Sequence, residues 1–115
     1  MDHTIELLYT TVSSEAEAKD LAKTALRQRY AACVNIIPQA ISLYEWEGKI
    51  EESSECLVIF KTSALQILLL KEWLMQNHPY TVPAILNGAI NASQTFAQYI
   101  QESTSISPTG GTSPL

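Results

Sequence analysis

The side chain best suited to chemistry in this sequence is His78, which lies in the run Asn77-His78-Pro79-Tyr80. An imidazole in a turn at the end of a helix is more accessible than one in a core, and it can ligate copper or zinc. The alternative is a helix-terminal histidine that hydrogen-bonds a free backbone carbonyl, which the helix dipole favours. For His78 taken alone, the second arrangement is the more common one.

Five carboxylates gather within a short stretch of the chain. They are Glu45, Glu47, Glu51, Glu52 and Glu55. Such a cluster could attract a divalent cation through hard oxygen ligands. More often, charges on a projecting hairpin keep its tip solvated and prevent edge-to-edge aggregation. Because the stretch lacks an alternating Asp, Asn and Gly loop pattern, we favour the second interpretation.

Tyr44 and Trp46 are two residues apart and share one face of the strand that we expect there. Leaving both aromatic rings exposed on a free hairpin would be costly, so they should pack under a neighbour or line a pocket. Packing in a core or interface is the interpretation we prefer.

The standard catalytic and cofactor motifs are missing from the sequence. It has no Gly-rich phosphate loop, no Cys-x-x-Cys, no His-Glu-x-x-His and no Gly-x-Ser-x-Gly. Lys61 and His78 could take part in acid/base chemistry, but no nucleophile is paired with them. We therefore expect a protein that is not an enzyme and requires no cofactor.

Length and charge limit the remaining classes. With 115 residues and 46% hydrophobic content, the chain can form one domain around one core. Seven basic and twelve acidic residues give a net charge of −5, which argues against a nucleic acid partner. No apolar run approaches the roughly 20 residues of a membrane helix, and nothing resembles a signal peptide. We expect a cytoplasmic protein with no membrane partner.

The first two elements are predicted from composition and spacing. Residues 4–12 are rich in β-branched and aromatic side chains and predict a strand. Ser14 and Glu17 form a capping-box pattern, so a helix should begin there. Its apolar face is largely alanine, which allows close packing on a sheet, and we expect Arg27 and Arg29 in its last turn.

Residues 32–62 change to a period of two and predict a long β-hairpin with Glu47-Gly48 as its loop. This register places Trp46 opposite Lys49. Pro38 removes a donor from the ladder, so we expect a bulge or bend there.

The two cysteines, Cys33 and Cys56, lie in apolar contexts, where a thiol often behaves as a small core residue. The hairpin register places Cys33 near Thr62 rather than near Cys56. Because a disulfide needs Cα atoms within about 7 Å, we expect no bridge.

The second half of the chain continues with a helix over residues 64–77, which we expect Ser63 to cap. Its apolar side chains cover more than one stripe, which indicates a subunit contact or, alternatively, a deeply buried helix. Residues 80–90 predict a strand broken by Pro83, and the proline favours an edge position.

Ser93 or Asn91 can cap a final helix, and residues 103–115 cannot bury enough surface to order themselves. We therefore expect a folded domain over residues 1–102 and a flexible tail over residues 103–115. The order strand, helix, strand, strand, helix, strand, helix predicts an α+β fold, a ferredoxin-like βαββαβ sandwich with a C-terminal helix.

Four stretches, taken together, resemble the CutA family of divalent-cation tolerance proteins. They are residues 30–38 (YAACVNIIP), 42–51 (SLYEWEGKIE), 61–62 (KT) and 78–83 (HPYTVP). The resemblance runs in consistent order from about residue 5 to residue 101. It implies a homotrimer whose long hairpins pair across subunits, and a role in tolerance of divalent metals, copper especially. It also implies likeness to PII signalling proteins, which bind small effectors in clefts between subunits.

The resemblance also implies which side chains line such a cleft, with His78 as the metal ligand. They are Tyr44, Trp46, Lys61, His78 and Tyr80. The family pattern usually has acidic residues where this chain has Thr81 and Ala84, and some members have a cysteine where this chain has Thr10. Because Cu(I) prefers sulfur, we expect weaker metal binding here than the family name suggests.

Three functions remain open at this point. The first is a trimeric protein of metal response that binds copper or another divalent cation at His78. The second is a PII-like sensor of a small organic molecule, in which Tyr44 and Trp46 stack on the ligand and Lys61 pairs with its charge. The third is a structural trimer that scaffolds another protein.

Overall fold

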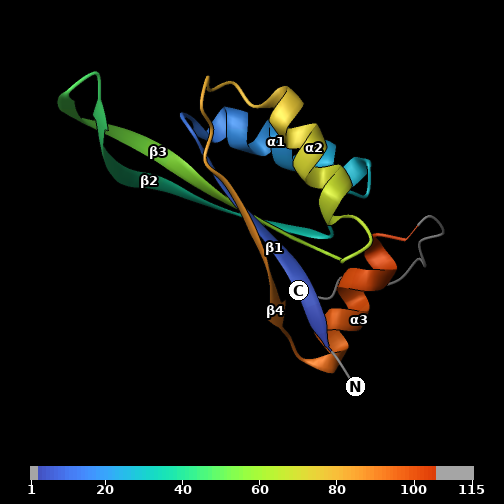
Figure 1. The fold of residues 1–115 in the computed structure, drawn as a ribbon. Helices are drawn as coiled ribbons and strands as arrows, with labels where there is room; N and C mark the ends of the chain where they lie inside the picture. The colour runs from blue at the N-terminus through green and yellow to red at the C-terminus, as the bar shows by residue number, and fades with distance from the viewer. Residues whose placement is uncertain (1–2, 106–115) are drawn as a thin grey trace.

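Four strands form one antiparallel sheet in the order β2-β3-β1-β4, and three helices pack on it (Figure 1). The structure, a computed structural model, describes residues 3–105. The elements are β1 (Thr4–Val12), α1 (Glu15–Arg27), β2 (Cys33–Trp46), β3 (Lys49–Thr62), α2 (Ile67–Asn77), β4 (Ile85–Asn91) and α3 (Gln94–Ser103). The predicted α+β, ferredoxin-like order with a C-terminal helix is confirmed.

The main core lies between α1, α2 and one face of the sheet. Leu8 and Val12 alternate along β1 toward this face, and Phe60 lies opposite Leu8 on β3. Lys61, the neighbour of Phe60, points to the other face, where its Nζ lies 5.6 Å from the ring centroid of Phe96 in α3. The helices α1 and α2 therefore cover one face of the sheet, and α3 contacts the other.

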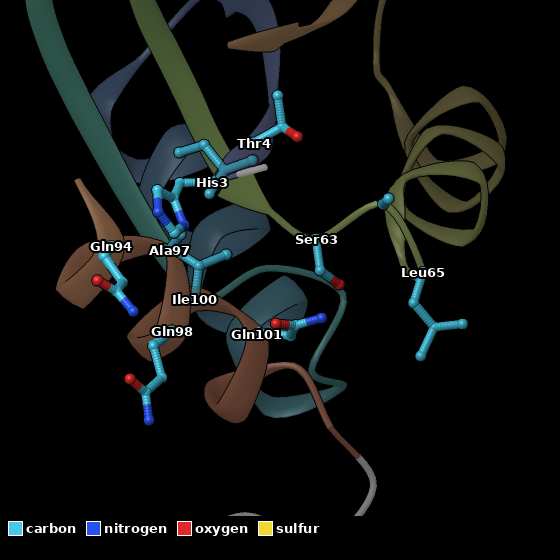
Figure 2. A pocket seen from close by; sticks show the side chains of 11 residues that line it. His3, Thr4, Ser63, Leu65, Gln94, Ala97, Gln98, Ile100 and Gln101 are labelled. Atoms are coloured by element: carbon cyan, nitrogen blue, oxygen red, sulfur yellow. The ribbon is translucent and has the colours of Figure 1, made fainter. Parts of the chain in front are cut away.

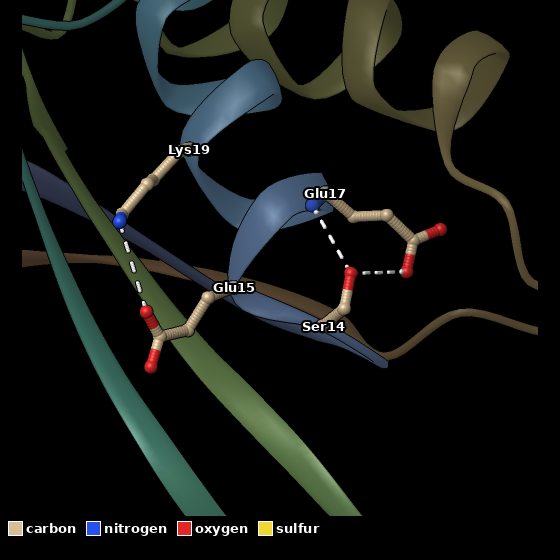
Figure 3. Close-up of polar contacts among 4 residues, drawn as sticks. All are labelled: Ser14, Glu15, Glu17 and Lys19. Atoms are coloured by element: carbon tan, nitrogen blue, oxygen red, sulfur yellow. Dashed lines mark hydrogen bonds and ion pairs between the residues drawn. The ribbon is translucent and has the colours of Figure 1, made fainter.

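The start of α1 follows the predicted capping pattern, as Figure 3 shows. The backbone N–H of Glu17 donates to Ser14 Oγ at 3.2 Å, which satisfies one of the free donors in the first turn. The end of the helix differs from the prediction. Arg27 is in the last turn, but Arg29 lies outside the helix with a φ of 62°. Its left-handed backbone ends α1 two residues earlier than expected.

The predicted hairpin and its register are confirmed. Trp46 pairs with Lys49 around a loop in which Glu47 and Gly48 both have positive φ, as a tight hairpin turn requires. The register shifts between Ile37 and Ala40, which is the bulge expected at Pro38. Cys33 pairs with Lys61, and both cysteines are free thiols, as predicted.

The start of α2 differs from the prediction. The helix begins at Ile67 rather than at residue 64, and its N-cap is Gln66, which makes no side-chain cap. Ser63 does not cap it, because the Ser63 hydroxyl is 2.9 Å from the hydroxyl of Thr104, far along the chain. The other end agrees with the prediction, since His78 has an extended backbone before Pro79.

The fourth strand is shorter than predicted. It is an edge strand beside β1, as expected, but it begins at Ile85 rather than at residue 80. Residues 80–84 form no strand, and Pro83 among them has no N–H to donate to a ladder.

Ser93 is the cap of α3 and accepts a hydrogen bond from the backbone N–H of Phe96 at 3.3 Å. The helix includes Ser103, and Thr104 after it is buried. Ser105 donates a hydrogen bond from its hydroxyl to the carbonyl oxygen of Glu102 at 2.7 Å, so the first three residues of the predicted tail are part of the fold. Residues 106–115, the rest of that tail, lie outside the described residues.

A single chain leaves much apolar surface uncovered. On α2, Leu68 and Met75 are exposed, and on the projecting end of the hairpin Ile41 and Ile50 are 73% and 80% exposed. The excess of apolar side chains predicted for α2 is therefore present. Within residues 3–105, none of the helices is both long and apolar enough to cross a membrane.

Candidate functional site

His78 is held by both ring nitrogens at the point where α2 ends. Its Nε2 is 2.9 Å from the carbonyl oxygen of Thr11 and 2.9 Å from the hydroxyl of Thr10. Its Nδ1 accepts a hydrogen bond from the backbone N–H of Tyr80 at 3.1 Å. Because Nδ1 accepts, the ring proton of the neutral imidazole is on Nε2 and is donated toward β1. This is the hydrogen-bonded alternative for His78, with a strand carbonyl as the acceptor.

Tyr80 continues the chain of contacts toward the hairpin. Its hydroxyl donates to Glu55 Oε2 at 2.6 Å, and its ring centroid lies 4.8 Å from that of His78 in an edge-to-face arrangement. We call the connected residues Thr10, Thr11, His78, Tyr80 and Glu55 the His78–Glu55 network. It joins β1, the end of α2 and β3.

The protonation states in the network follow from its geometry. Burial lowers the pKa of His78. Burial also raises the pKa of Tyr80, and the hydrogen bond to Glu55 and the charge of Glu55 raise it further. For Glu55, burial acts to raise the pKa, but hydrogen bonds from Ser42, Tyr80 and Thr11 outweigh it and lower the pKa. At neutral pH the network thus contains a neutral imidazole, a protonated phenol and an ionised carboxylate.

Tyr44 and Trp46 lie farther out on the hairpin. Tyr44 pairs with Glu51 and Trp46 with Lys49, so by alternation both side chains are on the same face of the hairpin as Glu55. They are 46% and 52% exposed in the single chain. The two rings therefore form an uncovered aromatic extension of the network along the arm.

Lys61 is at the other end of the sheet. It is six positions from Glu55 along β3, which corresponds to roughly 20 Å. Its ammonium group lies over Phe96 of α3 instead. One chain thus brings His78 and Tyr80 together, leaves Tyr44 and Trp46 along the arm, and does not bring Lys61 to either group.

Sequence reasoning missed the particular roles of Glu55, Thr10 and Thr11. In the sequence Glu55 was only one of five hairpin carboxylates. The last pair between β1 and β3 is Val12 with Cys56, so Glu55 is the first residue of β3 beyond the end of β1, and this position could have distinguished it. Within residues 3–105, no three or more His, Cys, Asp or Glu side chains form a group that could hold a metal ion. The described side chains of one chain do not by themselves fit a metal, and both nitrogens of His78 have partners already.

Comparisons with known proteins agree with the fold. The family model for the CutA1 divalent ion tolerance protein matches residues 6–103. A divalent-cation tolerance protein CutA of Thermus thermophilus is 38% identical over 86% of this chain and 97% of its own length. The crystal structure of the CutA1 divalent ion tolerance protein from Ehrlichia chaffeensis has a TM-score of 0.86, 32% identity, and coverage of 89% of this chain and 96% of that one.

Human protein CutA is 38% identical over 84% of this chain, but the match covers only 53% of the human protein. The chain thus spans about half the length of the mouse and human relatives that it matches. Relatives are also named for different compartments, the chloroplast in Arabidopsis thaliana and the periplasm in Archaeoglobus fulgidus. Fold, motif order and extent of the match agree, and the chain belongs to the CutA1 family of divalent ion tolerance proteins.

Proposed function

We propose that this protein acts in tolerance of divalent cations as a homotrimer that binds copper or another divalent cation in clefts between subunits. Family membership supports the cation class. The location of the site is supported by the contacts of Tyr80. Its hydroxyl donates to an ionised carboxylate, Glu55, and its backbone N–H donates to an imidazole, His78. Both groups are ligands that transition metals use.

A second copy of the chain is needed to complete such a site. Within the described residues, one chain supplies too few donors in one place. Two observations support a cleft whose two sides come from different subunits. Ile41 and Ile50 on the arm are uncovered in one chain, and Lys61 lies far from Tyr44 along the hairpin. In this proposal Tyr44, Trp46 and the network come from one copy, and Lys61 comes from the next.

The cleft is proposed as a binding site rather than an active site. In the His78–Glu55 network each potential acid or base is already hydrogen-bonded to a neighbour. The hydroxyl of Thr10 lies 2.9 Å from His78 Nε2, but that nitrogen carries the ring proton and so cannot take one from the hydroxyl. The names of the relatives are not enzyme names.

Native mass spectrometry with one equivalent of Cu(II) per chain tests the proposal. The parent protein should be a trimer that takes up copper in steps of one per subunit, and His78→Ala should lose this uptake. His3→Ala is the matched control, because it removes the other histidine of the sequence and leaves the network intact. Equal uptake by the parent and by His78→Ala would contradict the proposal.

A small organic effector is the second candidate for the same cleft. The observation that favours it is the exposed aromatic pair, Tyr44 and Trp46, on the face that carries Glu55. Trp73 is the other tryptophan, so Trp73→Phe isolates the fluorescence of Trp46. A response to deproteinised cell extract but not to metal salts would support this candidate, and silence toward both would count against it.

A scaffold role and a cytoplasmic location stay predictions. Deleting residues 106–115 should abolish capture of a protein partner, if the chain is a scaffold, and leave the assembly intact. The deletion has to spare Thr104, because its side chain is buried against Ser63.

A further inference from the structure

A cavity of about 430 Å³ lies at the far end of the sheet from the hairpin arm. Its walls come from the first residues of β1, the connection between β3 and α2, and α3, as Figure 2 shows. None of the residues of the His78–Glu55 network lines it. Its volume is within the range of roughly 300–1,000 Å³ typical of small-molecule sites.

The base of the cavity is apolar. Ile5 and Ile100 are both buried and line it from β1 and α3, and the half-buried Ala97 of α3 lines it as well. Gln66, beside the wall, donates from Nε2 to the carbonyl oxygen of Thr104 at 3.0 Å and so ties the connection to the end of α3. The cavity is thus held by contacts between distant parts of the chain.

The rim is polar and has no carboxylate, ammonium or guanidinium group. Gln94, Gln98 and Gln101 follow one face of α3, and Ser63 lies across from them (Figure 2). Within residues 3–105, the side-chain amides of Gln94 and Gln101 have no hydrogen-bond partner, whereas Gln98 donates to Glu102 at 3.1 Å. None of the lining residues is Asp, Glu, Lys or Arg, and the imidazole of His3 is the ionisable side chain among them.

We propose that this cavity binds a small uncharged ring compound with an amide-like edge. The apolar base offers a surface for the face of a ring, and the amides of Gln94 and Gln101 each offer a donor and an acceptor side by side, as glutamine does toward the edge of adenine. A carboxylate or phosphate on the ligand would find no lysine or arginine in the lining, where the imidazole of His3 is the one group that can carry a positive charge, and an unpaired charge is costly to bury. The inference does not depend on the function proposed for the His78–Glu55 network.

Nicotinamide is a suitable probe, and nicotinate is its matched control, because the two share a ring and differ in charge. We expect millimolar nicotinamide to shift the methyl NMR signals of Ile5 and Ile100 in the full chain, and nicotinate to leave them unchanged. Gln101→Ala should weaken the binding of nicotinamide about tenfold, the loss of roughly one hydrogen bond. Gln76→Ala, on the exposed side of α2, should not change it.

Ala97→Leu should abolish binding by filling part of the cavity beside Ile100. If the leucine disturbs folding, Gln101→Ala still tests the proposal, because Gln101 is exposed and its substitution should leave the fold intact. Several results would overturn the proposal: no shift at Ile5 and Ile100, equal shifts with nicotinate, or shifts that survive both substitutions. Copper uptake by His78 is a separate measurement, so failure of one inference leaves the other untouched.

Discussion

The hydroxyl of Tyr80 donates a hydrogen bond of 2.6 Å to the carboxylate of Glu55, across 25 residues of sequence. This contact ties the segment after α2 to the hairpin strand β3. Because the acceptor is ionised, the bond is stronger than one between neutral groups. It also orients the Tyr80 backbone, whose N–H donates to His78. Tyr80 therefore contacts both ionisable groups of the network, Glu55 through its hydroxyl and His78 through its backbone N–H.

Tyr80→Phe should lower the free energy of unfolding by about 1 kcal/mol. Hydrogen bonds to charged groups contribute roughly 1.5–3 kcal/mol, and the partial exposure of this pair reduces that figure. Urea denaturation measures the effect. Tyr44→Phe is the control, because within residues 3–105 the Tyr44 hydroxyl makes no hydrogen bond to Glu55 and acts on Tyr80 only electrostatically. An equal loss in both variants would show that the Glu55 contact contributes nothing.

Glu55 should make the stability of the fold depend on pH in the acid range. Its pKa is lowered in the folded chain from an ordinary value of 4.5, so the unfolded chain binds its proton first. The stabilisation is fully present above pH 4.5 and is lost as pH falls through the folded pKa. Glu55→Gln should show a flatter decline of urea midpoint with falling pH than the parent, whereas Glu47→Gln at the hairpin tip should follow the parent.

His78 should remain neutral below the pH at which a free imidazole is protonated. Burial lowers its folded pKa from 6.5, so its contribution to stability is complete above pH 6.5 and declines as pH falls below it toward the folded pKa. Nitrogen-15 NMR of a His3→Gln background should find the ring proton on Nε2 at pH 7. A proton on Nδ1 would contradict the hydrogen bond from Tyr80.

The parts of the fold that depend on local signals were predictable. The Ser14 cap, the Glu47-Gly48 loop and the bulge near Pro38 each follow from neighbouring residues, and the structure has all three. The start of α2 was not predictable, because the Ser63 hydroxyl is used by Thr104, which is 41 residues away. A contact between residues so far apart in the chain cannot be predicted from a local sequence pattern.

The same distinction applies to the site. His78 and Tyr80 could be predicted together because they are two residues apart. Their partner Glu55 could not be distinguished from the other hairpin glutamates, since the choice depends on where β1 ends against β3. Lys61 was expected to line the same cleft as Tyr44 and His78. Within a single chain the register of the sheet places it far from both, and the sequence motifs alone do not give that distance.

The cap of α1 should contribute more than the ion pair beside it. Ser14→Ala should lower the free energy of unfolding by about 1 kcal/mol, because the Glu17 N–H loses its acceptor. Glu15 and Lys19 form an exposed pair at 3.7 Å, so Glu15→Gln should cost only about 0.3 kcal/mol (Figure 3). Thermal denaturation of both variants ranks the two effects, and a reversed ranking would contradict the capping role.

The hairpin arm should carry the contacts between subunits. Ile41 and Leu43 project from β2 beyond the end of β1 and are mostly exposed in one chain. Burying each side chain would stabilise an assembly by roughly 1.5–3 kcal/mol per chain, so the double substitution Ile41→Ser and Leu43→Ser should dissociate it. Native mass spectrometry measures the state of assembly, and circular dichroism checks that the released chain keeps its fold. Leu68→Ser, an equally exposed change on α2, is the control, and loss of assembly in that variant alone would assign the subunit contact to α2 instead.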